Sequence, residues 1–120
     1  YRENNLSKIN MNAAFPIWKI DTKFLIEDFI AKGFASVTCC ISEKHLDKTW
    51  IGKTINENFI KELPATVDPC GENGEYHTFC YKGPIFKNEI KFSLGETMHK
   101  FYSPEENGFW FVDLIQHNEL

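Results

Sequence analysis

The 120-residue sequence has no long hydrophobic run and no excess of positive charge. None of its apolar stretches approaches the roughly 18 residues of a membrane-spanning helix. Its 13 basic residues are outnumbered by 17 acidic ones, which gives a net charge of -4, and the two signs are interspersed. This balance argues against proteins that follow the phosphates of nucleic acids and against polybasic membrane-surface proteins. We therefore predict no nucleic-acid partner and no membrane partner.

Several common catalytic motifs are also missing. The sequence contains neither of the glycine-rich phosphate loops, GxxxxGK[ST] or GxGxxG, and no GxSxG nucleophile turn. These residues therefore show no recognisable means of holding a triphosphate.

Cysteine occurs only four times, as Cys39, Cys40, Cys70 and Cys80. An even count could form two disulfides, but a disulfide scaffold is usually shorter and denser in cysteine. We therefore expect reduced thiols, a cytoplasmic location and no bound metal. A zinc site of Cys70, His77 and Cys80, with Cys39 or Cys40 as a further ligand, is an alternative that lacks the paired short spacings of structural zinc sites.

The first half of the chain has an alternating helix and strand pattern within an ordinary globular composition, 42% hydrophobic and 25% charged. Asp21 is placed to cap an amphipathic helix over residues 22–32, and Gly33 is placed to end it. The apolar segment 34–42 is typical of a strand buried on both faces, as in a parallel sheet. We interpret this helix and strand as the second half of a βαβ unit.

The second half is rich in turns and strands. Asn56 precedes a short helix that Pro64 ends, and the turn-rich segment 64–75 follows. Residues 76–83, 89–94 and 109–115 have the composition and alternation of strands. The tryptophans are expected in the core, at positions Trp18, Trp50 and Trp110.

Reactive side chains are densest in residues 68–78, DPCGENGEYHT. If a strand begins near Glu75, its period of two places Glu75 and His77 on one face. A carboxylate beside an imidazole could act as a base or could orient an amine nucleophile. The alternative is a surface turn followed by an edge strand whose polar face meets water.

Residues 67–86, VDPCGENGEYHTFCYKGPIF, closely resemble the signature of the diphthine–ammonia ligase-like ATP pyrophosphatases. These are adenine-nucleotide alpha-hydrolase (PP-loop) enzymes. Residues 15–18 look like the family's PLW element, and residues 33–35 continue the likeness. Residues 46–63 are similar to the family's L…WxGRxID..FL..LP, with Lys53 in place of arginine, and residues 108–111 resemble the end of bacterial members. The likeness covers almost the whole chain, but only the C-terminal half of a full family member.

The resemblance implies an α/β fold in two parts. Residues 1–63 would be the last part of a Rossmann-like, doubly wound nucleotide domain, and residues 64–120 a smaller, mainly antiparallel α+β region that recognises the substrate. It also implies an ATP-dependent ligase in which ATP adenylates a carboxylate, pyrophosphate leaves and ammonia displaces AMP to form an amide. ATP and Mg²⁺ are the implied cofactors. The family's Ser-Gly-Gly-Lys-Asp-Ser phosphate loop is absent here, so we expect these 120 residues alone to be inactive.

The site residues are carried over from the motif. We assign Glu75 and His77 to the catalytic step, where they would position or deprotonate the nucleophile. This assignment comes from their chemistry and not from the family. We predict that the substrate is bound by Asp68, Glu72, Asn73, Gly74 and Thr78.

The motif names the reaction class better than the substrate. Archaeal and eukaryotic diphthamide enzymes carry a sequence like EGGEYET, whereas residues 72–78 read ENGEYHT, which resembles a bacterial subgroup. Either a protein carboxylate or a small-molecule carboxylate is therefore a candidate, and a homo-oligomer stays open. The competing functions are a non-catalytic module that binds a substrate or partner, and the metal-binding domain described above.

Overall fold

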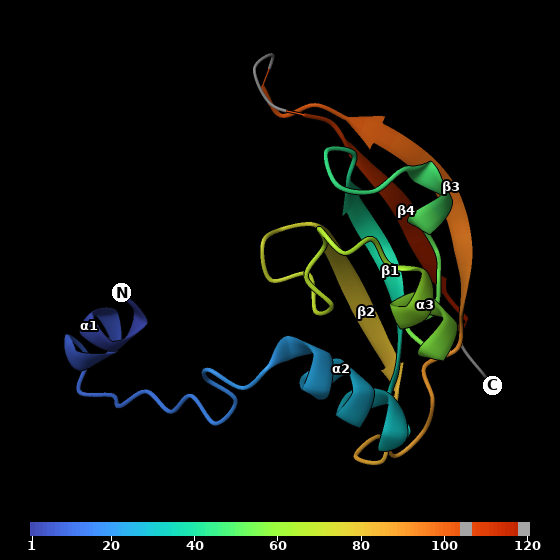
Figure 1. Cartoon of the computed structure of the whole chain (residues 1–120). Helices are drawn as coiled ribbons and strands as arrows, with labels where there is room; N and C mark the ends of the chain where they lie inside the picture. Colours follow the sequence, from blue (N-terminus) through green and yellow to red (C-terminus); the bar gives the residue numbers. More distant parts are fainter. Residues whose placement is uncertain (104–106, 118–120) are drawn as a thin grey trace.

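The computed structural model describes residues 1–103 and 107–117 (Figure 1). Its four strands form one sheet in the order β2-β1-β4-β3, and neighbouring strands are antiparallel. This combination of helices with an antiparallel sheet confirms the predicted α+β region. In chain order the elements are α1 (Arg2–Ser7), α2 (Thr22–Ala31), β1 (Ala35–Ser42), the 3-10 helix η1 (Lys48–Trp50), α3 (Glu57–Glu62), β2 (Tyr76–Lys82), β3 (Phe92–Lys100) and β4 (Phe109–Gln116).

Strand β1 is the strand predicted at residues 34–42, but its neighbours differ from the prediction. It pairs antiparallel with β2 on one edge and with β4 on the other. The segment 52–55 continues the second edge, because Thr38 N donates to Lys53 O at 2.9 Å and Ile55 N donates to Ser36 O at 2.9 Å. The interpretation as a parallel βαβ strand is therefore wrong. Burial on both faces does not distinguish the two kinds of sheet when loops and helices cover an antiparallel strand.

The predicted division between residues 63 and 64 stays a prediction. Strand β1 precedes that position and β2, β3 and β4 follow it, and all four strands share one sheet.

Both predicted helix caps form. The Asp21 carboxylate accepts a hydrogen bond from Phe24 N at 3.1 Å, and the Asn56 side-chain carbonyl accepts one from Phe59 N at 2.9 Å. Gly33, with φ of +89°, follows the end of α2. These contacts satisfy N–H groups that a helix terminus otherwise leaves without a partner. The helix limits read from the sequence thus follow from local chemistry alone.

The core lies between the sheet and the segment that contains η1 and α3. Its centre is Ile41, with no exposed surface, and Phe59, which is 2% exposed. The Phe59 ring meets Trp50 edge-on at 5.3 Å and Tyr76 edge-on at 5.5 Å. Trp50 is buried and Trp110 packs against the same cluster, as expected. Trp18 is 70% exposed, so the prediction is wrong for this residue.

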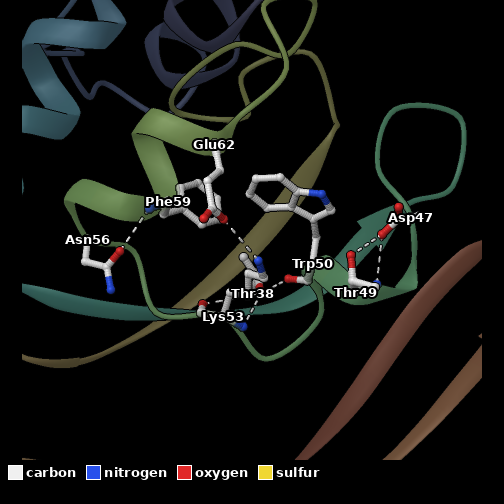
Figure 2. A network of polar contacts seen from close by, with 8 residues as sticks. All are labelled: Thr38, Asp47, Thr49, Trp50, Lys53, Asn56, Phe59 and Glu62. Atoms are coloured by element: carbon white, nitrogen blue, oxygen red, sulfur yellow. Dashed lines mark hydrogen bonds and ion pairs between the residues drawn. The ribbon is translucent and has the colours of Figure 1, made fainter.

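A buried hydroxyl fixes the η1 segment onto β1 (Figure 2). Thr38 has no exposed surface, donates to Trp50 O at 2.5 Å and accepts from Lys53 N at 2.9 Å. The Lys53 ammonium lies 4.6 Å from the centre of the Trp50 ring and 3.5 Å from Glu62. Strand, 3-10 helix and α3 are thereby held together by polar as well as apolar contacts.

The N-terminal segment lies apart from the sheet (Figure 1). Helix α1 has no buried residue, and the connector to α2 leaves Ile9, Ile17 and Trp18 more than half exposed. Among the described residues, no helix has both the length and the hydropathy that crossing a membrane requires.

A second set of polar contacts joins segments that are far apart in the sequence, the residue after β1, strand β3 and the residue before β4. The Glu43 carboxylate lies 2.6 Å from His99 Nε2 and accepts from Gly108 N at 2.8 Å. The hydrogen bond with His99, and after it the Gly108 N–H, hold the pKa of Glu43 below its usual value. His99 carried no signal in the sequence, because Glu43 is 56 residues away.

Candidate functional site

The motif loop, residues 68–75, is closed by the carboxylate of Glu75. This side chain is 1% exposed. Its Oε2 accepts from Asp68 N at 2.5 Å and its Oε1 accepts from Asn73 N at 2.7 Å. The carboxylate therefore bridges the two ends of the loop immediately before β2 begins.

Asp68 connects the same loop to α2. Its Oδ2 accepts from Cys70 N at 2.9 Å and from Glu72 N at 3.3 Å. Its Oδ1 accepts from the hydroxyl of Thr22, the first residue of α2, at 2.7 Å. A second hydrogen bond joins the loop to the same residue, because the Cys70 thiol donates to Thr22 O at 3.2 Å. The position of the loop is thus tied to the start of a helix that lies 46 residues earlier in the chain.

A groove of about 370 Å³ lies between α2 and the face formed by β1 and β2. Its walls are mainly apolar, and the motif loop supplies polar groups at one side. Asp28 and Lys32, also at the groove, form an ion pair with each other at 2.7 Å. The lining includes Leu25, Ile26 and Phe29 of α2, together with Cys70, Glu72 and Thr78.

Three carboxylates, those of Asp68, Glu72 and Asp21, act on the Cys70 thiol at the groove. Burial, followed by the charges of Asp68, Glu72 and Asp21, raises the pKa of the Cys70 thiol to about 11. Burial also strongly raises the pKa of the Tyr76 phenol. Both groups stay protonated at neutral pH, so Cys70 is not an activated nucleophile. The part of the groove beside Cys70 therefore suits a neutral or cationic part of a ligand better than an anionic part.

His77 and Thr78, two motif residues near the start of β2, lie on opposite faces of this strand. Thr78 and Tyr76 line the groove. His77 pairs in register with Cys40 of β1, which in turn pairs with Phe111 of β4. Residues directly opposite one another share a face, so these three side chains form a row on the face away from the groove.

The structure therefore divides the predicted site residues into three groups. Glu72 and Thr78 come together at the groove. Asp68, Asn73 and Gly74 belong to the loop, where Asp68 and Asn73 take part in its hydrogen bonds and Gly74 has φ of +80°.

Glu75 and His77 are not brought together. Glu75 precedes β2 with its carboxylate bound inside the loop, and His77 is exposed on the strand. Their expected shared face is not formed, while their catalytic assignment stays a prediction.

Sequence reasoning did not identify Thr22 or the α2 wall of the groove. The only local feature that could have pointed to Thr22 is its hydroxyl, placed directly after the N-cap residue Asp21. Its partner, Asp68, is brought to it by the tertiary fold alone.

The alternative zinc site has no support in the part of the chain that the structure describes. All four cysteines are free, and no group of three or more potential ligands is placed to hold a metal ion among the described residues. His77 and Cys80 have opposite positions in the alternation of β2, which separates two of the proposed ligands.

The motif loop does not fit a nucleotide phosphate. Loops that bind phosphate present free backbone N–H groups to the anion. Here the N–H groups of Asp68 and Asn73 are taken by Glu75, and those of Cys70 and Glu72 by Asp68. The loop already holds two carboxylates where a phosphate would have to bind.

Two glycines of the loop should respond differently to alanine. Gly71 and Gly74 both have positive φ, but a Cβ at Gly71 would lie 2.9 Å from Tyr76 O, whereas a Cβ at Gly74 meets nothing within 4 Å. We expect Gly74→Ala to lower the free energy of unfolding by about 1 kcal/mol and Gly71→Ala by about 2 kcal/mol. Urea unfolding measures both; equal losses would contradict the close approach of Tyr76.

Residues 21–116 match the family model described as diphthamide synthase C-terminal domain. A diphthine–ammonia ligase of Rattus norvegicus is 29% identical over 101 residues, which cover 80% of this chain and 38% of the relative. The Mus musculus protein of that name is 28% identical over 104 residues, with the same two shares. The Schizosaccharomyces pombe protein is 27% identical over 92 residues, which cover 73% of this chain and 15% of the relative. The chain thus corresponds to less than half the length of each of these relatives.

Proposed function

We propose a function from one premise: this chain belongs to the diphthamide synthase C-terminal domain family. It acts as the C-terminal, substrate-facing part of an ATP-dependent amide ligase. In this reaction ATP adenylates a carboxylate, pyrophosphate leaves, and ammonia displaces AMP to give an amide. The name of the relatives, diphthine–ammonia ligase, supports the ligase class and ammonia as the nitrogen donor.

The groove beside the motif loop is the observation that carries this proposal. It combines apolar walls with the Glu72 carboxylate and the Thr78 hydroxyl, both from the motif. Neither side chain has a hydrogen bond to another described residue, so both are available to a ligand. Glu72 would bind a cationic or hydrogen-bond-donating part of the substrate, and Thr78 would orient it. The substrate is a small-molecule or protein carboxylate whose largely apolar body would lie in the groove, with the reacting carboxylate outside it.

Glu75 and Asp68 would hold the loop and would not touch the reacting atoms. A general base must come within hydrogen-bond reach of the proton that it removes. Both oxygens of Glu75 already accept backbone hydrogen bonds in a side chain that is 1% exposed. His77 is exposed on the face of β2 away from the groove, so its proposed role as base for ammonia requires the reacting carboxylate to extend from the groove around this edge strand.

ATP and Mg²⁺ would be held by another part of the enzyme. The motif loop does not fit phosphate, and the described residues offer no set of ligands for a metal ion. We therefore assign no phosphate or metal contact to this chain. The filled loop equally favours a second candidate function, a module that binds a substrate or partner without catalysis.

The test combines this chain with an ATP-binding part that carries a phosphate loop, in one polypeptide or as a second protein. Pyrophosphate release is measured with ATP, Mg²⁺, ammonium chloride and a panel of carboxylates. We expect release that depends on both the carboxylate and this chain. Glu72→Gln should lower kcat/KM about tenfold, the effect of losing a hydrogen bond to a charged group.

Glu27→Gln is the matched control, because Glu27 is exposed on α2 and does not line the groove. It should leave kcat/KM unchanged. Binding of a panel carboxylate with no pyrophosphate release would instead support the non-catalytic module.

A further inference from the structure

We propose that Thr22 is a positioning residue, whose hydroxyl fixes the distance between α2 and the motif loop and thereby the shape of the binding groove. This inference rests on the proposed function only in taking the groove as the site where a ligand binds. Thr22 itself does not line the groove. It would act through Asp68 and Cys70.

The contacts form a closed circuit between helix and loop. The Thr22 hydroxyl donates to Asp68 Oδ1 at 2.7 Å, and the other oxygen of Asp68 accepts from Cys70 N at 2.9 Å. The circuit closes where the Cys70 thiol donates to Thr22 O at 3.2 Å. Both groups of Thr22 that can bond the loop, its hydroxyl and its carbonyl, are therefore used.

The circuit spans the two walls of the groove. Helix α2 supplies Leu25 and Phe29 to one wall, and the loop supplies Cys70 and Glu72 to the other. Asp68 Oδ2 also accepts from Glu72 N at 3.3 Å, which fixes the backbone of a residue that lines the groove. Loss of the Thr22 hydroxyl would leave Asp68 with loop contacts alone, so that of these contacts only the one from the Cys70 thiol to Thr22 O would still join α2 to the loop.

Valine and serine separate the hydroxyl of Thr22 from its shape. Thr22→Val keeps the volume and loses the hydroxyl, whereas Thr22→Ser keeps the hydroxyl and loses a methyl group. Thr54→Val serves as a matched control, because Thr54 is exposed and lies outside the groove. Each variant is made in the chain of 120 residues.

Two measurements report on the loop and on the groove. Nuclear magnetic resonance follows the amide signals and hydrogen exchange of Cys70 and Glu72. Fluorescence titration with N-phenyl-1-naphthylamine, a neutral apolar probe, gives the Kd of the groove.

We expect Thr22→Val to shift both amide signals, to speed their exchange about tenfold, and to raise the Kd for the probe about tenfold, since a hydrogen bond to a charged group is worth roughly that factor. Thr22→Ser should stay within about twofold of the unsubstituted chain, and Thr54→Val should match it.

Three results would overturn the inference: an unchanged Kd in Thr22→Val, an equal loss in Thr22→Ser, or no binding of the probe by the unsubstituted chain. Neither measurement involves catalysis. A failure to release pyrophosphate would therefore count against the proposed ligase and leave the role of Thr22 standing.

Discussion

Glu75→Leu is expected to lower the free energy of unfolding by about 3 kcal/mol and to release the motif loop from its closed form. Leucine fills a similar volume but accepts no hydrogen bond. The N–H groups of Asp68 and Asn73, now 2.5 and 2.7 Å from the carboxylate, would lose their acceptors. Urea unfolding measures the loss, and the amide exchange of Asp68 and Asn73 locates it.

Glu75→Gln tests whether the charge or only the shape of the side chain matters. Its carbonyl can accept from one of the two N–H groups, but its own NH₂ would face the other donor. We expect Glu75→Gln to lower the free energy of unfolding by less than Glu75→Leu does. Glu27→Leu, on the exposed face of α2, should change the free energy of unfolding by no more than about 0.5 kcal/mol. A stable Glu75→Leu protein with an unchanged loop would contradict the structural role of this carboxylate.

The stability of Glu75→Leu also bears on the search for a catalytic base. Loss of turnover in a Glu75 variant would have two causes, a misplaced loop or a missing base. Glu72→Gln and the Thr22 variants leave the Glu75 carboxylate in place. Comparison among them therefore separates the shape of the groove from proton transfer.

The sequence predicts best those features that depend on near neighbours. Asp21 and Asn56 cap helices because each accepts from an N–H three residues later, a relation visible in the sequence itself. The strand at 34–42 was found for a similar reason, since its β-branched and apolar residues favour an extended backbone. The strand expected at 89–94 instead begins at Phe92 and runs to Lys100, beyond the segment whose alternation identified it.

The direction of pairing and the division of the site depend on distant neighbours. No residue in the segment 34–42 indicates that β2 and β4 pair antiparallel with this strand. In the motif, a period of two was expected to place Glu75 and His77 on one face, but β2 begins at Tyr76, one residue after Glu75. Glu75 therefore belongs to the loop, where its carboxylate is buried. His77 and Thr78 are adjacent residues of β2 and so lie on opposite faces. Thr22 joins the site through a contact across 46 residues, which no local pattern encodes.

Thr38→Val should cost about 2 to 4 kcal/mol of unfolding free energy although it changes neither size nor shape. Thr38 has no exposed surface; its hydroxyl donates to Trp50 O at 2.5 Å and accepts from Lys53 N at 2.9 Å. Valine would leave the buried Trp50 O and the partly buried Lys53 N without this partner, a larger penalty than the loss of one average hydrogen bond.

Thr49→Val is the matched control for Thr38→Val within the same network (Figure 2). The Thr49 hydroxyl donates to Asp47 at an exposed position, where water can replace the lost contact. We expect this variant to lose less than about 1 kcal/mol. Thr38→Ser should recover most of the loss in Thr38→Val, because it restores the hydroxyl and removes only a methyl group. Urea unfolding of the three variants decides the matter: equal losses in Thr38→Val and Thr49→Val would show that the buried hydroxyl does not hold η1 on the sheet.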